Sequence, residues 1–216
     1  MNKMLKTSVL ILAFVQVFFA IGKGDDLVHF PHGPASWTVD VTPLPGGARL
    51  AQGTVIQKIE VTQDEHQRRC IVHWSNGSTR ETWMLTGLDV VLTEDPNGHA
   101  MLADNTYSFA VAFLPGDFLW LKPEFLQERD PIDYKGKKCL HYKGPSMHPV
   151  FSVRGEGDDP VMCEAWIDSK TLLPVALGDA TCVGTFTFLK APEAPLVLPA
   201  KFKSKLDRYK LLMANP

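Results

Sequence analysis

The stretch Cys70-Ile-Val-His-Trp-Ser-Asn-Gly-Ser-Thr-Arg-Glu-Thr-Trp-Met-Leu85 predicts a β-hairpin. Apolar residues recur at every second position on both sides of its centre, at Cys70, Val72 and Trp74 before it and at Trp83 and Leu85 after it. A period of two is typical of a strand with one apolar face. The central Asn76-Gly77 favours a tight turn, because both residue types tolerate positive φ.

The same alternation continues through the rest of the first half of the chain. Further apolar alternations occur at Trp37, Val39 and Val41, at Val55, Ile59 and Val61, and at Leu88, Val90 and Leu92. A second Asn-Gly turn is predicted at Pro96-Asn97-Gly98-His99. We therefore expect a meander of antiparallel hairpins.

The second half of the chain also contains strand patterns. They cover Lys137 to His141, Val161 to Ile167, Leu173 to Leu177, Cys182 to Phe188 and Ala200 to Tyr209. In the last of these, Phe202 and Leu206 alternate with lysines. Lysines on one face suit an edge strand, because they oppose aggregation.

The segment from Phe109 to Leu126 differs from the strands around it, because aromatic and aliphatic side chains crowd it without a regular period. Pro115-Gly116 and Pro123 prevent a single long element. We expect a strand or helical turn, a bend and then a short helix with Asp117 as its N-cap.

Many short antiparallel strands without long helices predict a mainly β fold, either a sandwich or a barrel. A sandwich would pack all the apolar faces against one another. A half-closed barrel would instead leave a cavity for the segment from Phe109 or for a ligand.

The N-terminus has the order of a secretory signal peptide, with basic residues in 1–6, an uncharged apolar run in 7–21 and then a polar segment. We expect cleavage after Gly22, a flexible lead-in over 23–35 and a single β domain over 36–216. The alternative is an uncleaved anchor, but the apolar run is shorter than the roughly 20 residues that span a bilayer.

The charge balance gives no basis for nucleic-acid binding. The chain has 22 Lys and Arg against 24 Asp and Glu, a formal net charge of −2. Removal of Lys3 and Lys6 with the signal peptide leaves 20 basic and 24 acidic residues, a charge of −4. A nucleic-acid-binding protein would need a basic surface.

The four cysteines would meet an oxidising compartment after export, where paired thiols are expected. They are Cys70, Cys139, Cys163 and Cys182, and four cysteines allow three pairings. If the strands around Cys139 and Cys163 run antiparallel across the intervening loop, these two fall opposite each other. A Cys139–Cys163 disulfide is therefore predicted.

Common catalytic and metal-binding patterns are incomplete in this sequence. The stretch Gly144-Pro-Ser-Met-His148 begins like a nucleophile elbow, but a histidine replaces the second glycine and its prolines favour an irregular loop. His29 and His32 form the only close histidine pair and lack further ligands. A disulfide explains Cys139 better than a nucleophile paired with His141. We therefore predict no enzyme, no metal and no cofactor.

The tryptophans leave two interpretations open. They are Trp37, Trp74, Trp83 and Trp166 in strand patterns, and Trp120 in the middle segment. They could form a large aromatic core or line a cavity.

Several short motifs resemble the lipoprotein-sorting carriers of the outer membrane, the LolA/LolB-like superfamily, and their uncharacterised relatives. The motifs are Trp166-Ile-Asp168 with a polar turn before Leu172-Leu-Pro174, Phe118-Leu-Trp-Leu121, Tyr134-Lys-Gly-Lys-Lys-Cys139 and Val197-Leu-Pro-Ala-Lys-Phe202. The resemblance covers residues 115 to 207. One departure is the lead-in, which is rich in Pro and Gly where the carriers usually begin with a helix that plugs the barrel.

This resemblance implies an unclosed antiparallel β-barrel with an apolar concave face and a short helical or loop lid. It places the protein in the periplasm of a Gram-negative bacterium, with secretion as the alternative. Family members carry the acyl chains of lipoproteins, so the implied partners are a lipid or a lipoprotein acyl chain and, in addition, a membrane-associated protein.

We therefore predict a carrier or sensor whose hydrophobic ligand lies between the strand tryptophans and the middle segment. The predicted ligand-binding residues are Trp37, Val39, Ile59, Val61, Trp74, Trp83, Leu85, Phe109, Phe113, Trp120, Phe125 and Trp166. The alternative is a non-enzymatic structural or protein-interaction module whose barrel or sandwich core is filled by its own side chains.

Overall fold

The structure is a computed structural model that describes residues 27–45, 55–88, 90–95, 97–104, 115–147, 151 and 159–214. The predicted signal peptide over residues 1–22 lies outside this part of the chain.

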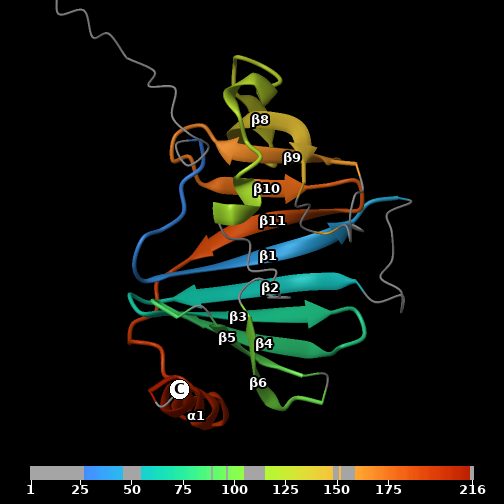
Figure 1. Cartoon of the computed structure of the whole chain (residues 1–216). Helices are drawn as coiled ribbons and strands as arrows, with labels where there is room; N and C mark the ends of the chain where they lie inside the picture. The colour runs from blue at the N-terminus through green and yellow to red at the C-terminus, as the bar shows by residue number, and fades with distance from the viewer. Residues whose placement is uncertain are drawn as a thin grey trace, which may run out of the picture.

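Within the described residues, the strands form one 11-stranded antiparallel sheet that is not closed (Figure 1). They are β1 (Ala35–Pro43), β2 (Ile56–Gln63), β3 (Gln67–Trp74), β4 (Thr79–Leu85), β5 (Val90–Glu94), β6 (Ala100–Asp104), β7 (Ile132–Tyr134), β8 (Lys137–Ser146), β9 (Val161–Asp168), β10 (Pro174–Gly178) and β11 (Cys182–Leu189). The predicted mainly β fold, an unclosed antiparallel half-barrel, is confirmed.

The strand order is β6-β5-β4-β3-β2-β1-β11-β10-β9-β8-β7, so the sheet consists of two meanders. Strands β1 to β6 run outward to one edge, and strands β7 to β11 return from the other edge. The meanders meet where β1 pairs with β11, with Val39 opposite Phe186. Both predicted Asn-Gly turns are present, and Gly77 and Gly98 each have a φ of +81°.

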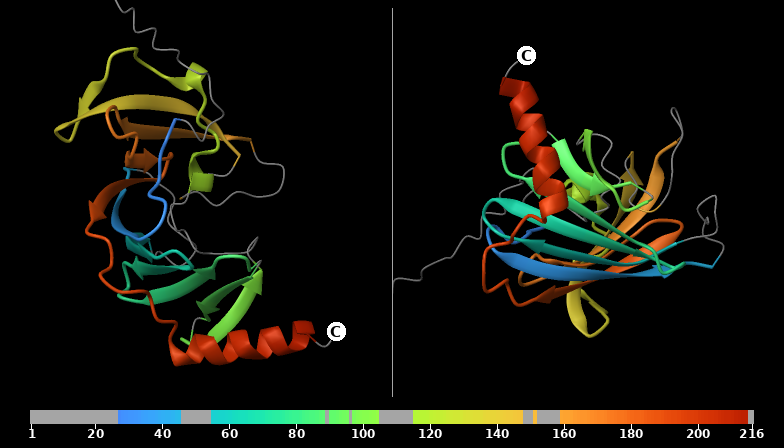
Figure 2. Two further views of the ribbon diagram at one scale, coloured as in Figure 1. Left: turned by 90° about the vertical axis from the view of Figure 1, so that its left-hand side faces the viewer. Right: turned by 90° about the horizontal axis from the view of Figure 1, so that it is seen from below.

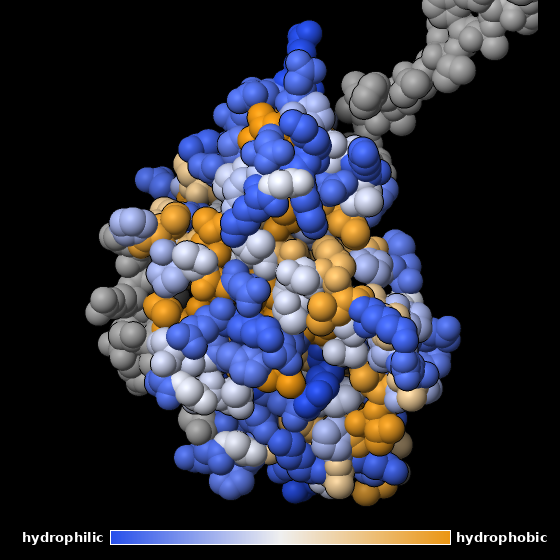
Figure 3. Space-filling model, turned by 180° about the vertical axis from the view of Figure 1, so that it is seen from behind, coloured by the Kyte–Doolittle hydropathy of each residue, from blue (hydrophilic) through white to orange (hydrophobic). Residues whose placement is uncertain are grey.

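The sheet is strongly curved, which gives it a concave inner face and a convex outer face (Figure 2). On the inner side lie two short 3₁₀ turns, η3 (Pro115–Phe118) and η4 (Pro123–Phe125). The helix α1 (Ala200–Ala214) lies on the outer side against β5 and β6. Seen from behind, the molecule shows mostly hydrophilic residues, with apolar ones in separate patches (Figure 3).

Each face has its own hydrophobic cluster. The inner cluster contains residues of β1, β2, β3 and β8 to β11 together with Phe30, Phe118 and Trp120. The outer cluster consists of Trp83, Leu92, Ala100, Phe202 and Leu206. The helix α1 therefore completes the core on the opposite side of the sheet from the larger cluster.

The predicted edge strand from Ala200 to Tyr209 is wrong, because these residues belong to α1. Phe202 and Leu206 are buried, and their spacing of four places both on one face of a helix. Lysine, leucine and arginine are also strong helix formers. No helix in the described part of the chain is both long and apolar enough to cross a membrane.

Three other segments differ from expectation. Strands β6 and β7 were not predicted; both are short and lie at the edges of the sheet. The middle segment contains two 3₁₀ turns, and Asp117 lies within η3 rather than capping a helix. The lead-in contains Val28 and Phe30, whose side chains are buried in the inner cluster.

Candidate ligand-binding face

The inner face is apolar because alternate residues of its central strands are apolar. In β1 and β2, Trp37 lies opposite Val61 and Val39 lies opposite Ile59. In β3, Cys70 continues the row beyond Val61. Trp37, Val39 and Ile59 are fully buried, with 0% of their surface exposed.

The rows of apolar residues that face one another across neighbouring strands continue past the junction between the two meanders. Phe186 of β11 lies opposite Val39. Farther along, Leu177 of β10 faces Ala165 of β9, and Ala165 in turn faces Tyr142 of β8. All of these side chains are buried, so the apolar face extends over most of the width of the sheet.

A chain segment that we call the crossover (residues 115–126) covers part of this face. Its Phe118 ring lies 5.6 Å from the ring of Phe30 and 6.1 Å from that of Phe186, measured between centroids. Trp120 and Leu121 are also buried in the inner cluster. Aromatic side chains from three distant parts of the sequence therefore meet above the sheet.

The end of the crossover rests on β8. The ring of Phe125 stacks on Trp120, with 6.4 Å between centroids, and covers the backbone of Gly144. A Cβ atom at Gly144 would lie only 2.6 Å from Phe125 Cγ, so glycine makes this close approach possible. Leu126 forms a β-bridge with Tyr142.

Two indole N–H groups of this face lack an acceptor among the described residues. Trp37 Nε1 and Trp120 Nε1 are buried and have no hydrogen-bond partner there. A buried donor without an acceptor is costly, and native structures contain few of them. The inner face thus combines an apolar surface with two indole N–H donors that have no acceptor among the described residues.

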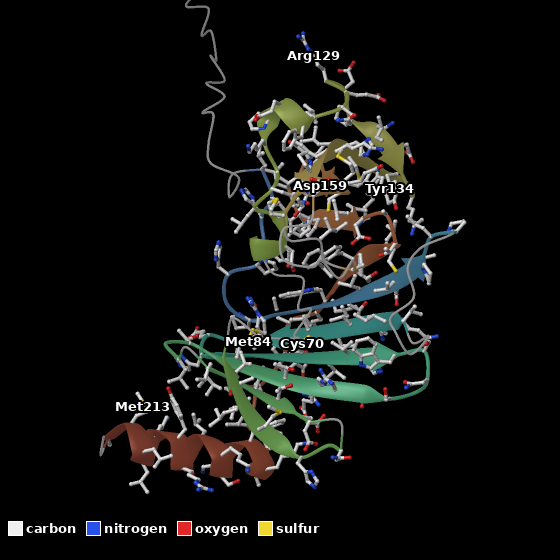
Figure 4. All side chains as sticks on the ribbon, turned by 45° about the vertical axis from the view of Figure 1, so that its right-hand side comes forward. Cys70, Met84, Arg129, Tyr134, Asp159 and Met213 are labelled. Atoms are coloured by element: carbon white, nitrogen blue, oxygen red, sulfur yellow. The ribbon has the colours of Figure 1, made fainter. Side chains whose placement is uncertain are left out.

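A cavity of about 320 Å³ opens at one end of the inner face. It is lined by Pro31, His32, Gly33, Gln63, Asp64, Gln67, Arg68, Met84, Leu85 and Thr86. Figure 4 labels Met84 from β4 and Cys70 from β3, which mark the cavity and the adjoining apolar row. This end of the face is polar, whereas its centre is apolar.

A second cavity, of about 460 Å³, lies beside the hairpin that joins β7 and β8. Its lining includes Lys135, Lys137, Asp168, Thr171 and Thr187. The ammonium group of Lys135 donates to the Thr185 hydroxyl, 2.8 Å away, and so ties the hairpin to β11. This cavity contains no residue of the predicted ligand-binding set.

The structure brings together only part of the predicted ligand-binding set. Seven members lie in or against the inner cluster: Trp37, Val39, Ile59, Val61, Trp74, Trp120 and Phe125. Trp83 belongs to the outer cluster beneath α1, and Leu85 packs against that cluster and also lines the cavity of about 320 Å³. Phe109 and Phe113 lie outside the described residues.

Trp166 also lies away from the inner face. Its ring is stacked between Tyr134, 4.5 Å away, and His141, 4.9 Å away, measured between centroids. Ala165 and Ile167, its neighbours in β9, are the residues that face inward. Because successive strand residues point to opposite faces, Trp166 faces outward.

The sequence prediction omitted three aromatic residues that form the centre of the inner cluster, namely Phe30, Phe118 and Phe186. The alternation in Cys182 to Phe188 could have identified Phe186. No periodic signal marks Phe30 or Phe118, since both lie in irregular segments.

The predicted Cys139–Cys163 disulfide is wrong: all four cysteines are described and buried, and none of them is in a disulfide. Cys139 lies opposite Asp168, and Cys163 lies opposite Gly144, so the two thiols point to opposite faces of the sheet. Burial raises the pKa of the Cys70 and Cys163 thiols to about 12 each. Neither is therefore a thiolate at neutral pH.

The first three residues of the stretch that resembles a nucleophile elbow are not a loop. Gly144 to Ser146 form the end of β8 and pair with β9. Within the described residues, no three His, Cys, Asp or Glu side chains gather in a group that could hold a metal ion.

Sequence comparisons identify no relative. Neither a protein-family model nor a curated protein sequence matches this chain. The proposals below therefore depend on the geometry of the chain itself.

Proposed function

We propose that this protein is a carrier or sensor of a hydrophobic ligand, such as an acyl chain, which binds to the inner face of the half-barrel. The observation that carries the proposal is what covers the inner face. Among the described residues, the curved apolar sheet is covered by the irregular crossover and the lead-in, and not by a second sheet. The free energy needed to open such irregular segments is lower than that needed to separate the strands of a packed sandwich.

The energetics suit such a ligand. Burial of a methylene group contributes about 0.8 kcal/mol, so one long acyl chain contributes on the order of 10 kcal/mol before the costs of ordering. No catalytic residue is needed for this function. The resemblance to lipoprotein-sorting carriers and the predicted signal peptide fit a periplasmic carrier of this kind.

The described inner residues are already buried beneath the crossover, so a ligand would have to displace Phe118, Trp120 and Phe125. This burial also favours the alternative, an interaction module whose interior is filled by its own side chains. Ligand uptake distinguishes the two functions, because only a carrier lifts the crossover and admits an acyl chain between it and the sheet.

The test is uptake of a fluorescent fatty acid by delipidated protein, together with native mass spectrometry of gently purified protein. We expect saturable uptake and co-purifying lipid. Phe125→Glu and Trp120→Glu should weaken uptake at least tenfold, because each places a charge against the acyl chain. Melting temperatures of both variants show how much of the loss reflects folding.

The matched control is Met162→Glu, since Met162 lies in β9 and is 48% exposed. This variant should take up the fatty acid as the wild type does. A wild-type protein that is empty after purification and takes up no fatty acid would overturn the carrier proposal and favour the filled module.

A further inference from the structure

The polar end of the inner face contains an arginine, Arg68, that has no anionic partner among the described residues. Arg68 precedes Cys70 and Val72 at alternate positions of β3, so all three side chains share the inner face. Gln63 lies opposite Arg68 in β2, and Met84 lies opposite it in β4. The cation thus stands at the end of an apolar row.

A neutral side chain holds this arginine in place. Arg68 Nε and Nη2 donate to Gln63 Oε1 at 3.0 and 2.8 Å. Gln63 Nε2 in turn donates to the carbonyl oxygens of Pro31, at 2.8 Å, and Gly33, at 2.7 Å. The guanidinium also lies over the ring of Trp37, 5.9 Å from its centroid.

These contacts fix the orientation of the guanidinium without neutralising its charge. Arg68 makes no ion pair with any described residue, and its remaining N–H donors have no partner there. Burial lowers the pKa of Arg68, because the cation loses hydration and gains no counter-ion. A partly buried, unpaired and pre-oriented arginine favours an oxyanion, since guanidinium binds carboxylate and phosphate in a bidentate manner.

The cavity of about 320 Å³ at Arg68 provides room for such a group. Its lining includes one carboxylate, Asp64, which is already satisfied. Asp64 Oδ1 accepts the backbone N–H groups of His66 and Gln67 at 2.8 and 2.9 Å, and Oδ2 accepts that of Leu196 at 2.7 Å. Burial would raise the pKa of Asp64, but these backbone donors lower it below its ordinary value.

We propose that Arg68 and its cavity bind the carboxylate or phosphate headgroup of an anionic amphiphile whose chain lies along the inner face. The inference rests on the proposed carrier function and specifies its ligand class. From Arg68 to Val72 the apolar row extends about 13 Å along β3, so headgroup and chain have adjoining sites. Trp37, beneath the guanidinium, links the two.

The experiment compares two ligands of equal chain length, palmitate and hexadecanol, by displacement of a fluorescent probe from delipidated full-length protein. We expect palmitate to bind the wild type at least tenfold more tightly, since a charge-assisted hydrogen bond contributes more than a neutral one. Arg68→Gln should abolish this difference and leave hexadecanol affinity unchanged. Arg68→Lys should retain part of it.

The matched control is Arg69→Gln, because Arg69 is the next residue in β3 but lies on the outer face, where it pairs with Glu81. This variant should keep the full preference for palmitate. If Arg68→Gln does not fold, Arg68→Lys and the salt dependence of wild-type binding still provide the test. We expect added salt to lower the affinity for palmitate and to leave the affinity for hexadecanol unchanged.

The outcomes separate the two proposals. Equal affinities of the wild type for palmitate and hexadecanol would overturn the headgroup site and leave the carrier function standing. Binding of neither ligand would overturn the carrier function itself. If acetate or inorganic phosphate bound as tightly as palmitate, the site would serve a free anion and the amphiphile proposal would be overturned.

Discussion

Arg68 and Arg69 are neighbours in β3, yet they lie on opposite faces of the sheet in different surroundings. Each guanidinium lies about the same distance from a tryptophan ring, 5.9 Å for Arg68 over Trp37 and 6.0 Å for Arg69 over Trp83. On the outer face Arg69 Nε donates to Glu81 at 2.6 Å. On the inner face Arg68 donates to the neutral Gln63 and pairs with no carboxylate of the described residues.

The two tryptophans differ in the same way. Trp83 Nε1 donates to Glu81 Oε1 at 3.0 Å, and Lys201 of α1 pairs with Glu94 beside it. Trp37 Nε1 has no acceptor among the described residues. Around Trp83 the outer face thus pairs its donors with carboxylates, whereas around Trp37 the inner face keeps an indole donor and a cation that lack an anionic partner among the described residues. This difference supports a structural role for the outer face and a binding role for the inner face.

The largest effect is expected from removing the indole N–H on each face. Trp83→Phe should lower the free energy of unfolding by about 3 kcal/mol, because it removes volume and a hydrogen bond to a carboxylate. Trp37→Phe should cost only about 1 kcal/mol, since it removes similar volume and a donor that has no described partner. Urea denaturation of both variants measures the two values.

Trp83→Phe in a Glu81→Gln background is the control for this comparison. Once the carboxylate is gone, the cost of Trp83→Phe should fall towards that of Trp37→Phe. Equal costs for the two single variants would contradict the proposed difference between the faces.

The sheet itself was predictable from the sequence, but the assignment of side chains to its two faces was not. Period-two alternation and the two Asn-Gly turns identified most of the strands. Face assignment depends on the cross-strand register, which a shift of one residue inverts. Cys70 lies opposite Thr82, so Trp83 falls on the face opposite to Cys70.

The same parity argument explains the wrong disulfide. Cys139 lies opposite Asp168, an even-numbered residue, so the odd-numbered Cys163 points to the other face. The sequence could not reveal this, because β8 ends at Ser146 and β9 begins at Val161, a separation in sequence that does not define a register. In α1, the spacing of Phe202 and Leu206 fits both a strand and a helix, and only helix propensity favoured the observed structure.

A smaller effect is expected where the crossover meets the sheet. Gly144→Ala should lower the free energy of unfolding by about 1–2 kcal/mol, because the new Cβ overlaps the Phe125 ring. The displaced ring should also loosen the crossover and raise the binding of a hydrophobic dye. Denaturation and dye fluorescence measure the two effects.

A double-mutant cycle tests whether Phe125 is the cause. In a Phe125→Ala background, Gly144→Ala should cost almost nothing, because no ring remains to collide with the methyl group. If the cost persisted at full size in that background, the contact between crossover and β8 would not explain it.

The smallest effect is a pH dependence confined to the outer face. Glu164 accepts hydrogen bonds from Lys143 Nζ, at 2.7 Å, and lies 3.0 Å from His141 Nε2. Burial would raise the pKa of Glu164, but Lys143 and His141 lower it below its ordinary value of 4.5. A carboxyl whose pKa is lower in the folded state stabilises the fold above its ordinary pKa, and this contribution disappears as pH falls through the folded value.

Glu164→Gln should therefore lower the melting temperature slightly at pH 7, by the equivalent of under about 1 kcal/mol for a partly exposed pair. The difference from the wild type should be constant above about pH 5 and shrink as the pH falls below 4.5. Trp37→Phe should show no such change with pH, because the removed inner-face group does not titrate. A difference for Glu164→Gln that stayed constant down to pH 2 would mean that the charge of Glu164 contributes nothing to stability, and that the variant acts only through packing at that position.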